Sequence, residues 1–294
     1  MTYKQKNTLR PYVLLLPAYI AILGVIAFPI FRALVMSFQS YSLLKPNDIK
    51  FIAFGNYYKA LQDPVFWSSL VKTGVYVFGT VLFQFLFGLI FALMLNSTSF
   101  ISRVSRNLIL IPWVIPGVLA AFMWRWLFNA NYGLFNTILK SMGLINENIA
   151  WLTLPDTAMF AVIVASIWKG VPFFTLMLLA GLQSVPKELY EASKIDGASK
   201  WQQLFSITIP SIMPTIVTTT LLRIIWTANF VDIIFNMTEG GPGYSTQVLS
   251  VYTFMTARST LNYGYSASLS IFMTILLIVV IMIYVSRARK EEII

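Results

Sequence analysis

Four residues able to make polar or stacking contacts interrupt the apolar stretch 206–234 at intervals of three: Arg223, Trp226, Asn229 and Asp232. On a helix, this spacing forms a slowly drifting stripe along one side. Ionisable groups at membrane depth are costly, so they usually face a cavity or a partner. We therefore predict that Trp226, Asn229 and Asp232 line a pore. As alternatives, Arg223 and Asp232 could pair structurally with other groups, or Asp232 could simply lie at the outer interface.

A second candidate is the pair Trp168 and Lys169 in the apolar stretch 158–183. A lysine inside such a stretch can also face a cavity, although a purely structural role competes with this interpretation. An aromatic face beside a polar group is a common arrangement for holding a solute that has both apolar and hydroxyl surfaces. We include Trp168 and Lys169 in the predicted substrate site with Trp226, Asn229 and Asp232.

Several kinds of catalytic and cofactor chemistry are missing from the sequence. It contains no histidine and no cysteine, which removes the usual general base and the commonest metal ligands. The glycine-rich run Glu239–Gly243 carries no lysine, so it cannot serve as a Walker A phosphate loop. No carboxylate cluster has the spacing of a metal site. The chain is therefore expected to be no enzyme and to hold neither a metal nor a cofactor of its own.

The composition is that of an integral membrane protein. Of the 294 residues, 57% are hydrophobic and 11% are charged, whereas a soluble domain carries about 25% charged residues. The formal net charge of +10 is spread over segments that flank apolar stretches, which favours a lipid bilayer over nucleic acid as the partner. Six apolar stretches are long enough to cross a bilayer. They lie at about 11–38, 70–96, 107–128, 158–183, 206–234 and 263–286, in a single transmembrane domain of residues 1–294.

Basic residues indicate the orientation of the chain. One set lies on the side predicted to be cytoplasmic: Lys4, Lys6, Arg10, Arg103, Arg106, Lys187, Lys194, Lys200, Arg287, Arg289 and Lys290. A smaller set is spread over the longer loops of the opposite side. Both termini and the segment 184–205 are then predicted to be cytoplasmic. Pro112, Pro116 and Gly117 in the third stretch predict a bent helix.

The segment 184–205 carries clear signals for two short helices. Pro186 is favourable at the start of the first helix, and Gly197, after Asp196, can take the left-handed conformation that ends it. Ser199 and Gln202 have the spacing of a capping box and open the second helix. A folded helix–turn–helix at a membrane surface is typical of a docking device rather than of a plain connector.

This segment resembles the EAA loop of ABC-importer permeases. The similarity rests on Glu191-Ala192-Ser193, Gly197 and Ile207-x-Ile209-Pro210, with serine and isoleucine where the family pattern has alanine and leucine. Further motifs are similar to the sugar-importing subgroup with maltose- and glycerol-phosphate-type permeases. These are Gly55-Asn-Tyr, Asp63-Pro-x-Phe-Trp67, Trp168-Lys-x-x-Pro172, Gly181-Leu-Gln-x-x-Pro186 and Asn236-Met-Thr-x-Gly-Gly-Pro242.

The resemblance implies an all-α polytopic membrane protein of the type I ABC-importer permease fold, with six transmembrane helices and a cytoplasmic coupling loop. It implies a multi-pass subunit of a bacterial or archaeal cell membrane that imports a sugar or oligosaccharide. The implied partners are a second homologous permease, an ATPase dimer that binds ATP and Mg, and an extracytoplasmic solute-binding protein. The implied coupling residues are Glu188, Glu191, Ala192, Ser193, Asp196, Gly197 and Ala198.

Two other functions stay open at this point. An ion-coupled secondary transporter would need acidic groups near the membrane midplane, and Asp232 is the one candidate in the sequence. An ABC permease for a non-sugar solute, such as an amino acid or a peptide, is the other alternative.

Overall fold

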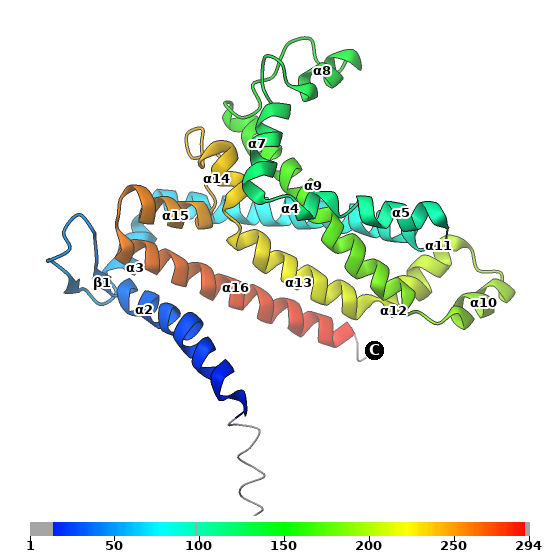
Figure 1. Ribbon diagram of the computed structural model, residues 1–294, viewed down its shortest axis with the longest axis horizontal. Helices are drawn as coiled ribbons and strands as arrows, with labels where there is room; N and C mark the ends of the chain where they lie inside the picture. Colours follow the sequence, from blue (N-terminus) through cyan, green and yellow to red (C-terminus); the bar gives the residue numbers. More distant parts are fainter. Residues whose placement is uncertain (1–13, 98, 292–294) are drawn as a thin grey trace, which may run out of the picture. The chain divides into compact units, whose positions relative to one another are not determined.

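The computed structural model describes residues 14–97 and 99–291 as a nearly all-helical protein (Figure 1). The described residues form two compact units, one within the segments 14–63 and 253–275 and the other within 64–97, 99–252 and 276–291. Five helices are long and apolar enough to cross a membrane, or six if the bent pair Val104–Val114 and Gly117–Leu127 counts as one span. The predicted start of the first span at residue 11, and the basic residues Lys4, Lys6 and Arg10, lie outside the described residues.

The first unit begins with the apolar helix Leu14–Ser37, which contains the π-helical turn η1 (Leu23–Ala27) and helix α2 (Phe28–Ser37). The two-residue strands β1 (Gln39–Ser40) and β2 (Lys50–Phe51) pair antiparallel, a small departure from the expected all-α fold. Helix α3 (Gly55–Gln62) is tied to this region because the Asn56 side-chain amide donates to the carbonyls of Ser37 and Gln39, each at 2.9 Å.

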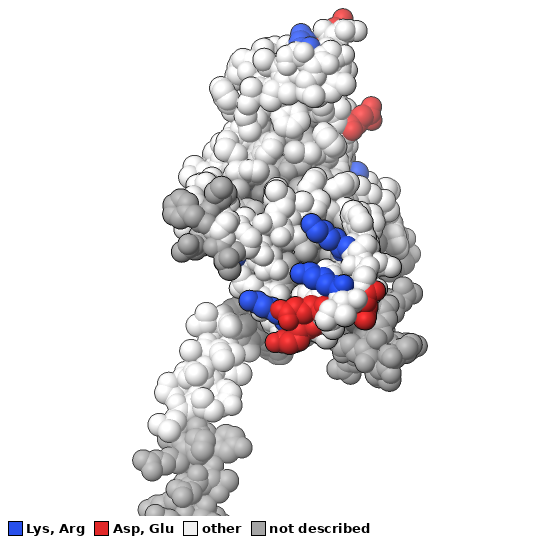
Figure 2. All heavy atoms as spheres, turned by 90° about the vertical axis from the view of Figure 1, so that its right-hand side faces the viewer, with Lys and Arg blue, Asp and Glu red and all other residues white. Residues whose placement is uncertain are grey.

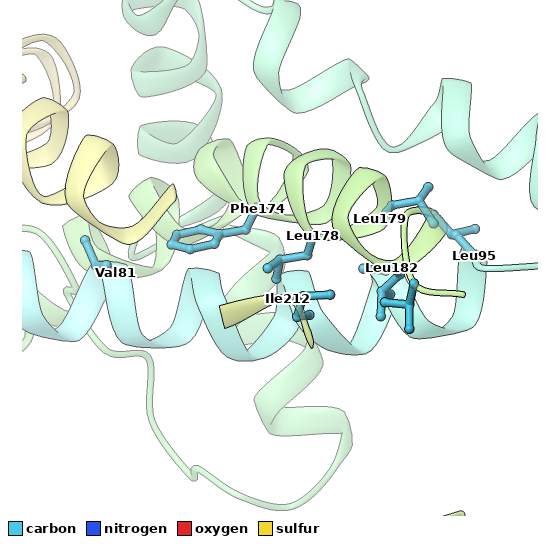
Figure 3. Close-up of a cluster of buried hydrophobic side chains, with 9 residues drawn as sticks. Val81, Leu95, Phe174, Leu178, Leu179, Leu182 and Ile212 are labelled. Carbon is cyan, nitrogen blue, oxygen red and sulfur yellow. The ribbon is translucent and has the colours of Figure 1, made fainter. Parts of the chain in front are cut away.

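The second unit is built on two long helices, α4 (Pro64–Leu95) and α9 (Pro155–Gln183), which pack against each other. Their contact buries Phe174, Leu178 and Leu182 of α9 in one apolar cluster with Val81 and Leu95 of α4 (Figure 3). The helices approach so closely that a Cβ atom on Gly88 would overlap Phe174. Small residues serve this purpose in membranes, where close van der Waals packing holds helices together. Helix α4 begins six residues before the predicted start at 70, since Pro64 is well suited to a first helical turn.

The third predicted span, 107–128, is broken. Helices α5 (Phe100–Leu108) and α6 (Ile111–Val114) precede α7 (Gly117–Leu127), and the two arms meet at 93°. Ile115 and Pro116 are extended, and proline has no N–H to continue a helical ladder. The bend predicted from Pro112, Pro116 and Gly117 is confirmed, and it is sharper than a kink within one helix.

The remaining helices include two further candidate spans, Met213–Thr238 and Tyr263–Ser286. Helix α8 (Leu134–Ser141) precedes α9, and α10 (Lys187–Ile195) and α11 (Lys200–Gln203) follow it. The predicted fifth span, 206–234, is not one continuous helix. It consists of the π-helical turn η2 (Leu204–Thr208), α12 (Ile209–Ser211), α13 (Met213–Asn229) and α14 (Asp232–Thr238). Helices α15 (Leu249–Ser259) and α16 (Tyr263–Glu291) complete the chain.

Candidate functional site

The segment 184–205 folds as the helix–turn–helix predicted from its sequence. Helix α10 has Pro186 at its N-cap and Asp196 at its C-cap, and Gly197 has φ +76°. The Gly197 N–H donates to the Lys194 carbonyl at 3.1 Å, and the Ala198 N–H donates to the Ser193 carbonyl at 2.9 Å. These two bonds form a Schellman motif, which requires a left-handed residue at the position of Gly197.

The second helix starts with the predicted capping box. The Ser199 Oγ accepts from the Gln202 N–H at 3.3 Å, and the Gln202 Oε1 accepts from the Ser199 N–H at 2.7 Å. The Tyr190 and Thr208 hydroxyls lie 3.0 Å apart and join α10 to the turn η2. The helix pair is therefore a folded element with its own internal contacts.

Most of the predicted coupling residues are accessible. Glu188, Glu191, Ala192, Asp196 and Gly197 are exposed. Ser193 is buried, and its hydroxyl donates to the Tyr190 carbonyl at 2.9 Å, while Ala198 is half-buried. Figure 2 views the molecule from the side on which α10 and α11 lie in Figure 1, and acidic and basic side chains gather there.

An apolar patch beside these charges was not identified from the sequence. Ile195 is 87% exposed and Trp201 is 71% exposed, and the rings of Trp201 and Phe205 stack with their centroids 6.1 Å apart. The signal was present, since these are large apolar residues in a polar segment. Exposed apolar groups rimmed by charge are typical of a protein interaction site. The helix pair thus exposes apolar rings beside charged side chains.

A second candidate site is a cavity of about 270 Å³ in the same unit. It is lined by residues of α4, α6, α9, α13 and α14 together with Phe230, which follows α13. These residues are Tyr76, Thr80, Trp113, Ser166, Lys169, Arg223, Trp226, Thr227, Phe230 and Ile233. The lining combines aromatic rings with hydroxyl groups and two basic side chains, which suits a solute that has apolar faces and polar edges.

A hydrogen-bonded network holds the arginine at this cavity. The Arg223 Nε donates to the Gln84 Oε1 at 2.9 Å, and the Gln84 Nε2 donates to the Ser166 carbonyl at 2.7 Å. The Ser166 Oγ lies 2.9 Å from the Tyr76 hydroxyl. A Cβ atom on Gly170 would overlap both Gln84 and Arg223, so the absence of a side chain at this position lets the two groups meet. The network therefore joins α4, α9 and α13.

The structure brings only two of the five predicted substrate residues to this cavity, Lys169 and Trp226. The Lys169 ammonium donates to the Ile115 carbonyl at the break between α6 and α7. Trp168, one residue away on the helix, lines a separate apolar groove with Trp124 and Pro172. Adjacent residues of a helix point about 100° apart, which explains this separation.

The predicted stripe ends before Asp232. Helix α13 stops at Asn229 because Phe230 is extended, so Asp232 begins a new helix and the three-residue spacing no longer defines one face. Asn229 is exposed, and its side-chain amide donates to the Ile225 carbonyl at 2.8 Å. Gln84, which the sequence analysis also missed, lies on another helix, α4. An amide inside the apolar stretch 70–96 was a signal that could have identified Gln84.

Comparison with known proteins extends these observations. A family model described as "Binding-protein-dependent transport system inner membrane component" matches residues 84–289. The chain is 36% identical over 290 residues to the trehalose/maltose transport system permease protein MalF of Thermococcus litoralis, and the match covers 98% of this chain and 97% of that protein. It is also 36% identical over 286 residues to the sulfoquinovosyl glycerol transport system permease protein SmoG of Agrobacterium fabrum, and this match covers 97% of this chain and 92% of that protein.

A solved structure shows the same fold. A chain of a bacterial alginate ABC transporter, determined in complex with an alginate pentasaccharide-bound periplasmic protein, superposes with a TM-score of 0.82. The two chains are 23% identical, and the match covers 97% of this chain and 96% of that chain. The fold class predicted from the sequence is confirmed.

Proposed function

Since this chain belongs to the binding-protein-dependent transport system inner membrane components and is a permease subunit of an ABC importer, we propose that it imports a sugar or an oligosaccharide. The observation that carries the substrate class is the 36% identity, over nearly the whole chain, to a permease named for trehalose and maltose. The second relative is named for sulfoquinovosyl glycerol, which also contains a sugar. The ion-coupled alternative is set aside because family membership indicates an ABC importer.

The helix pair α10–α11 is proposed as the element to which a separate ATPase binds. Its exposed acids Glu188, Glu191 and Asp196 would make polar contacts, and the Trp201–Phe205 stack would enter an apolar recess. The Schellman turn at Gly197 and the capping box at Ser199 keep the pair folded. Closure of the ATPase on ATP would then move α10 and α11 as one body and, through them, the adjoining spans α9 and α13.

The other proposed partners follow from the same family. A second homologous permease would complete the pore, and an extracytoplasmic binding protein would deliver the solute. ATP and Mg would be bound by the ATPase subunits, and this chain would contribute no ATPase site and no cofactor. Both termini and the α10–α11 pair would face the cytoplasm of a bacterial or archaeal cell.

The cavity around Arg223 is proposed as this chain's contribution to the solute path. Trp226 would stack on an apolar face of the sugar, and Lys169 would donate to its oxygen atoms. Asn229 and Asp232 are exposed and remain proposed pore residues outside the cavity. Trp168 remains in the proposed substrate site because it adjoins Lys169 in the sequence, although its own side chain lines the separate apolar groove.

Reconstitution tests this function. The full chain, reconstituted with its second permease, its ATPase and its binding protein, should take up radiolabelled sugar into proteoliposomes only when ATP is enclosed with the ATPase. A proton or sodium gradient should not replace ATP. Uptake that follows an ion gradient without the ATPase would refute the coupling proposal, and ATP-driven uptake of an amino acid instead of a sugar would refute the substrate class.

The orientation has a separate test that exploits the absence of native cysteine. Lys194→Cys in α10 and Lys140→Cys in α8 each introduce one exposed thiol. A membrane-impermeant maleimide added to intact spheroplasts should label the α8 variant, and it should label the α10 variant only in inside-out vesicles. The opposite pattern would place the helix pair on the outer surface and exclude docking of a cytoplasmic ATPase.

A further inference from the structure

The cavity lined by Arg223 and Lys169 offers more hydrogen-bond donors than its surroundings use. Thr80 and Thr227 also line it, both side chains are more than nine-tenths buried, and neither hydroxyl has a hydrogen-bond partner among the described residues. A guanidinium has five N–H donors, and one of those on Arg223 goes to Gln84. Unpaired polar groups in a buried site are costly, so this lining favours a ligand rich in acceptor oxygens.

The charge of the cavity is also unbalanced. Within residues 14–97 and 99–291, neither Arg223 nor Lys169 forms an ion pair closer than 4.0 Å. The side chain that accepts from Arg223 is the neutral amide of Gln84, and the guanidinium lies 5.8 Å from the centre of the Phe173 ring. Arg223 and Asp232 both lie within electrostatic range of Lys169, so one acidic group accompanies two basic ones. The described lining therefore carries an excess of positive charge at membrane depth, where charge is expensive.

The walls of the cavity are aromatic. Trp113, Trp226 and Phe230 line it, and the Trp226 ring lies 5.0 Å from that of Phe173. Such rings stack on the C–H faces of a sugar, while hydroxyls and cations meet its polar edge. The combination matches a carbohydrate that also bears a negative group.

We propose that the solute recognised in this cavity is an anionic sugar, one that carries a carboxylate, sulfonate or phosphate group, and that Arg223 selects this group. The inference rests on the proposed function, because it names the substrate class of the same importer. Arg223 suits the role because a guanidinium binds such groups with two parallel N–H···O bonds. The Gln84–Ser166–Tyr76 network orients its plane, and Gly170 leaves the space that the guanidinium occupies.

The first test identifies the cargo. The complete importer is purified with its binding protein, the bound solute is released and its mass is measured. An acidic sugar supports the inference, and the mass distinguishes carboxylate, sulfonate and phosphate. A neutral sugar overturns the inference and leaves the proposed function intact, whereas a solute that is not a sugar overturns both. If the binding protein is isolated without solute, it is titrated with glucuronate, sulfoquinovose, glucose 6-phosphate, glucose and maltose while its thermal unfolding is followed. Binding of an acidic sugar supports the inference, and binding of glucose or maltose alone overturns it. Binding of none of the five overturns both the inference and the proposed function.

The second test assigns the selectivity to this chain. ATP-driven uptake of the acidic sugar is compared with that of its uncharged counterpart in proteoliposomes. The ratio of acid to neutral uptake should fall at least about tenfold in Arg223→Gln, which loses a charge-assisted bond, and should recover in part in Arg223→Lys. Lys45→Gln removes an exposed positive charge that is not part of the cavity lining and should keep the native ratio. An equal fall of both uptakes in Arg223→Gln would show that Arg223 is structural and overturn the assignment.

Discussion

The turn between α10 and α11 allows the docking proposal to be tested with a matched pair of glycines. Gly197 has φ +76° and Gly143 has φ +69°, and a Cβ atom on either would meet nothing within 4 Å. Both lie at the same position of a Schellman motif, since the Gly143 and Leu144 N–H groups donate to the Lys140 and Leu139 carbonyls at 3.0 and 2.9 Å. A substitution by alanine therefore imposes the same backbone strain at both sites without a steric clash.

The size of the expected effect of Gly197→Ala follows from that backbone strain. A left-handed conformation costs an L-residue roughly 1–2 kcal/mol, which makes opening of the turn about 5 to 30 times more favourable. Gly197→Ala should weaken retention of the ATPase during copurification and lower the sugar taken up per ATP hydrolysed. Gly197→Asn should do less, because asparagine tolerates this conformation, and Gly197→Val should do more.

The control separates local strain from coupling. Gly143→Ala strains the end of α8 equally and should keep both ATPase retention and the uptake per ATP at native values. Equal losses in Gly143→Ala and Gly197→Ala would show that strain anywhere in the chain causes the effect. A Gly197→Val importer that holds its ATPase and transports normally would refute the role of the turn.

Three further perturbations test the structure itself, each by thermal unfolding of the detergent-solubilised chain unless stated otherwise. Gly88→Ala should destabilise the α4–α9 contact by about 1–3 kcal/mol through overpacking against Phe174. In the control Gly74→Ala, on the same helix, the new Cβ atom has no neighbour within 4 Å and should not lower the unfolding temperature. Equal unfolding temperatures for the two variants would argue against the close approach of α4 and α9. Gln84→Leu should destabilise the chain by about 1–3 kcal/mol, because it removes the acceptor of Arg223 Nε and the donor to the Ser166 carbonyl; native stability would mean that the network contributes nothing. Asn136→Ala should speed proteolysis between α8 and α9. Asn136 is buried, donates to the carbonyls of Ala130 and Ile149 and accepts from the Trp151 indole N–H. Cleavage no faster than in the exposed-site control Asn146→Ala would contradict this prediction.

Much of the helix pair could be predicted from the sequence because its determinants are local. Pro186, Gly197 and the Ser199–Gln202 capping box act within one helical turn of their own positions, and the structure contains each of these features. The sharp bend in the third span was predictable for the same reason, since Pro116 lacks the N–H that a continuing helix needs.

The cavity depended on contacts that no local pattern encodes. Arg223 bonds to Gln84 across 139 residues of sequence, and Gln84 bonds to Ser166 across 82, so the network exists only once α4, α9 and α13 have packed. The predicted stripe assumed one continuous helix through Trp226 and Asp232, and the extended backbone after Asn229 ends that helix between them. The sequence alone determined the membrane class, the approximate spans and the caps of the helix pair, because composition, hydropathy and capping are properties of neighbouring residues. Tertiary packing decided which polar side chains share a cavity, because that depends on how helices distant in sequence meet.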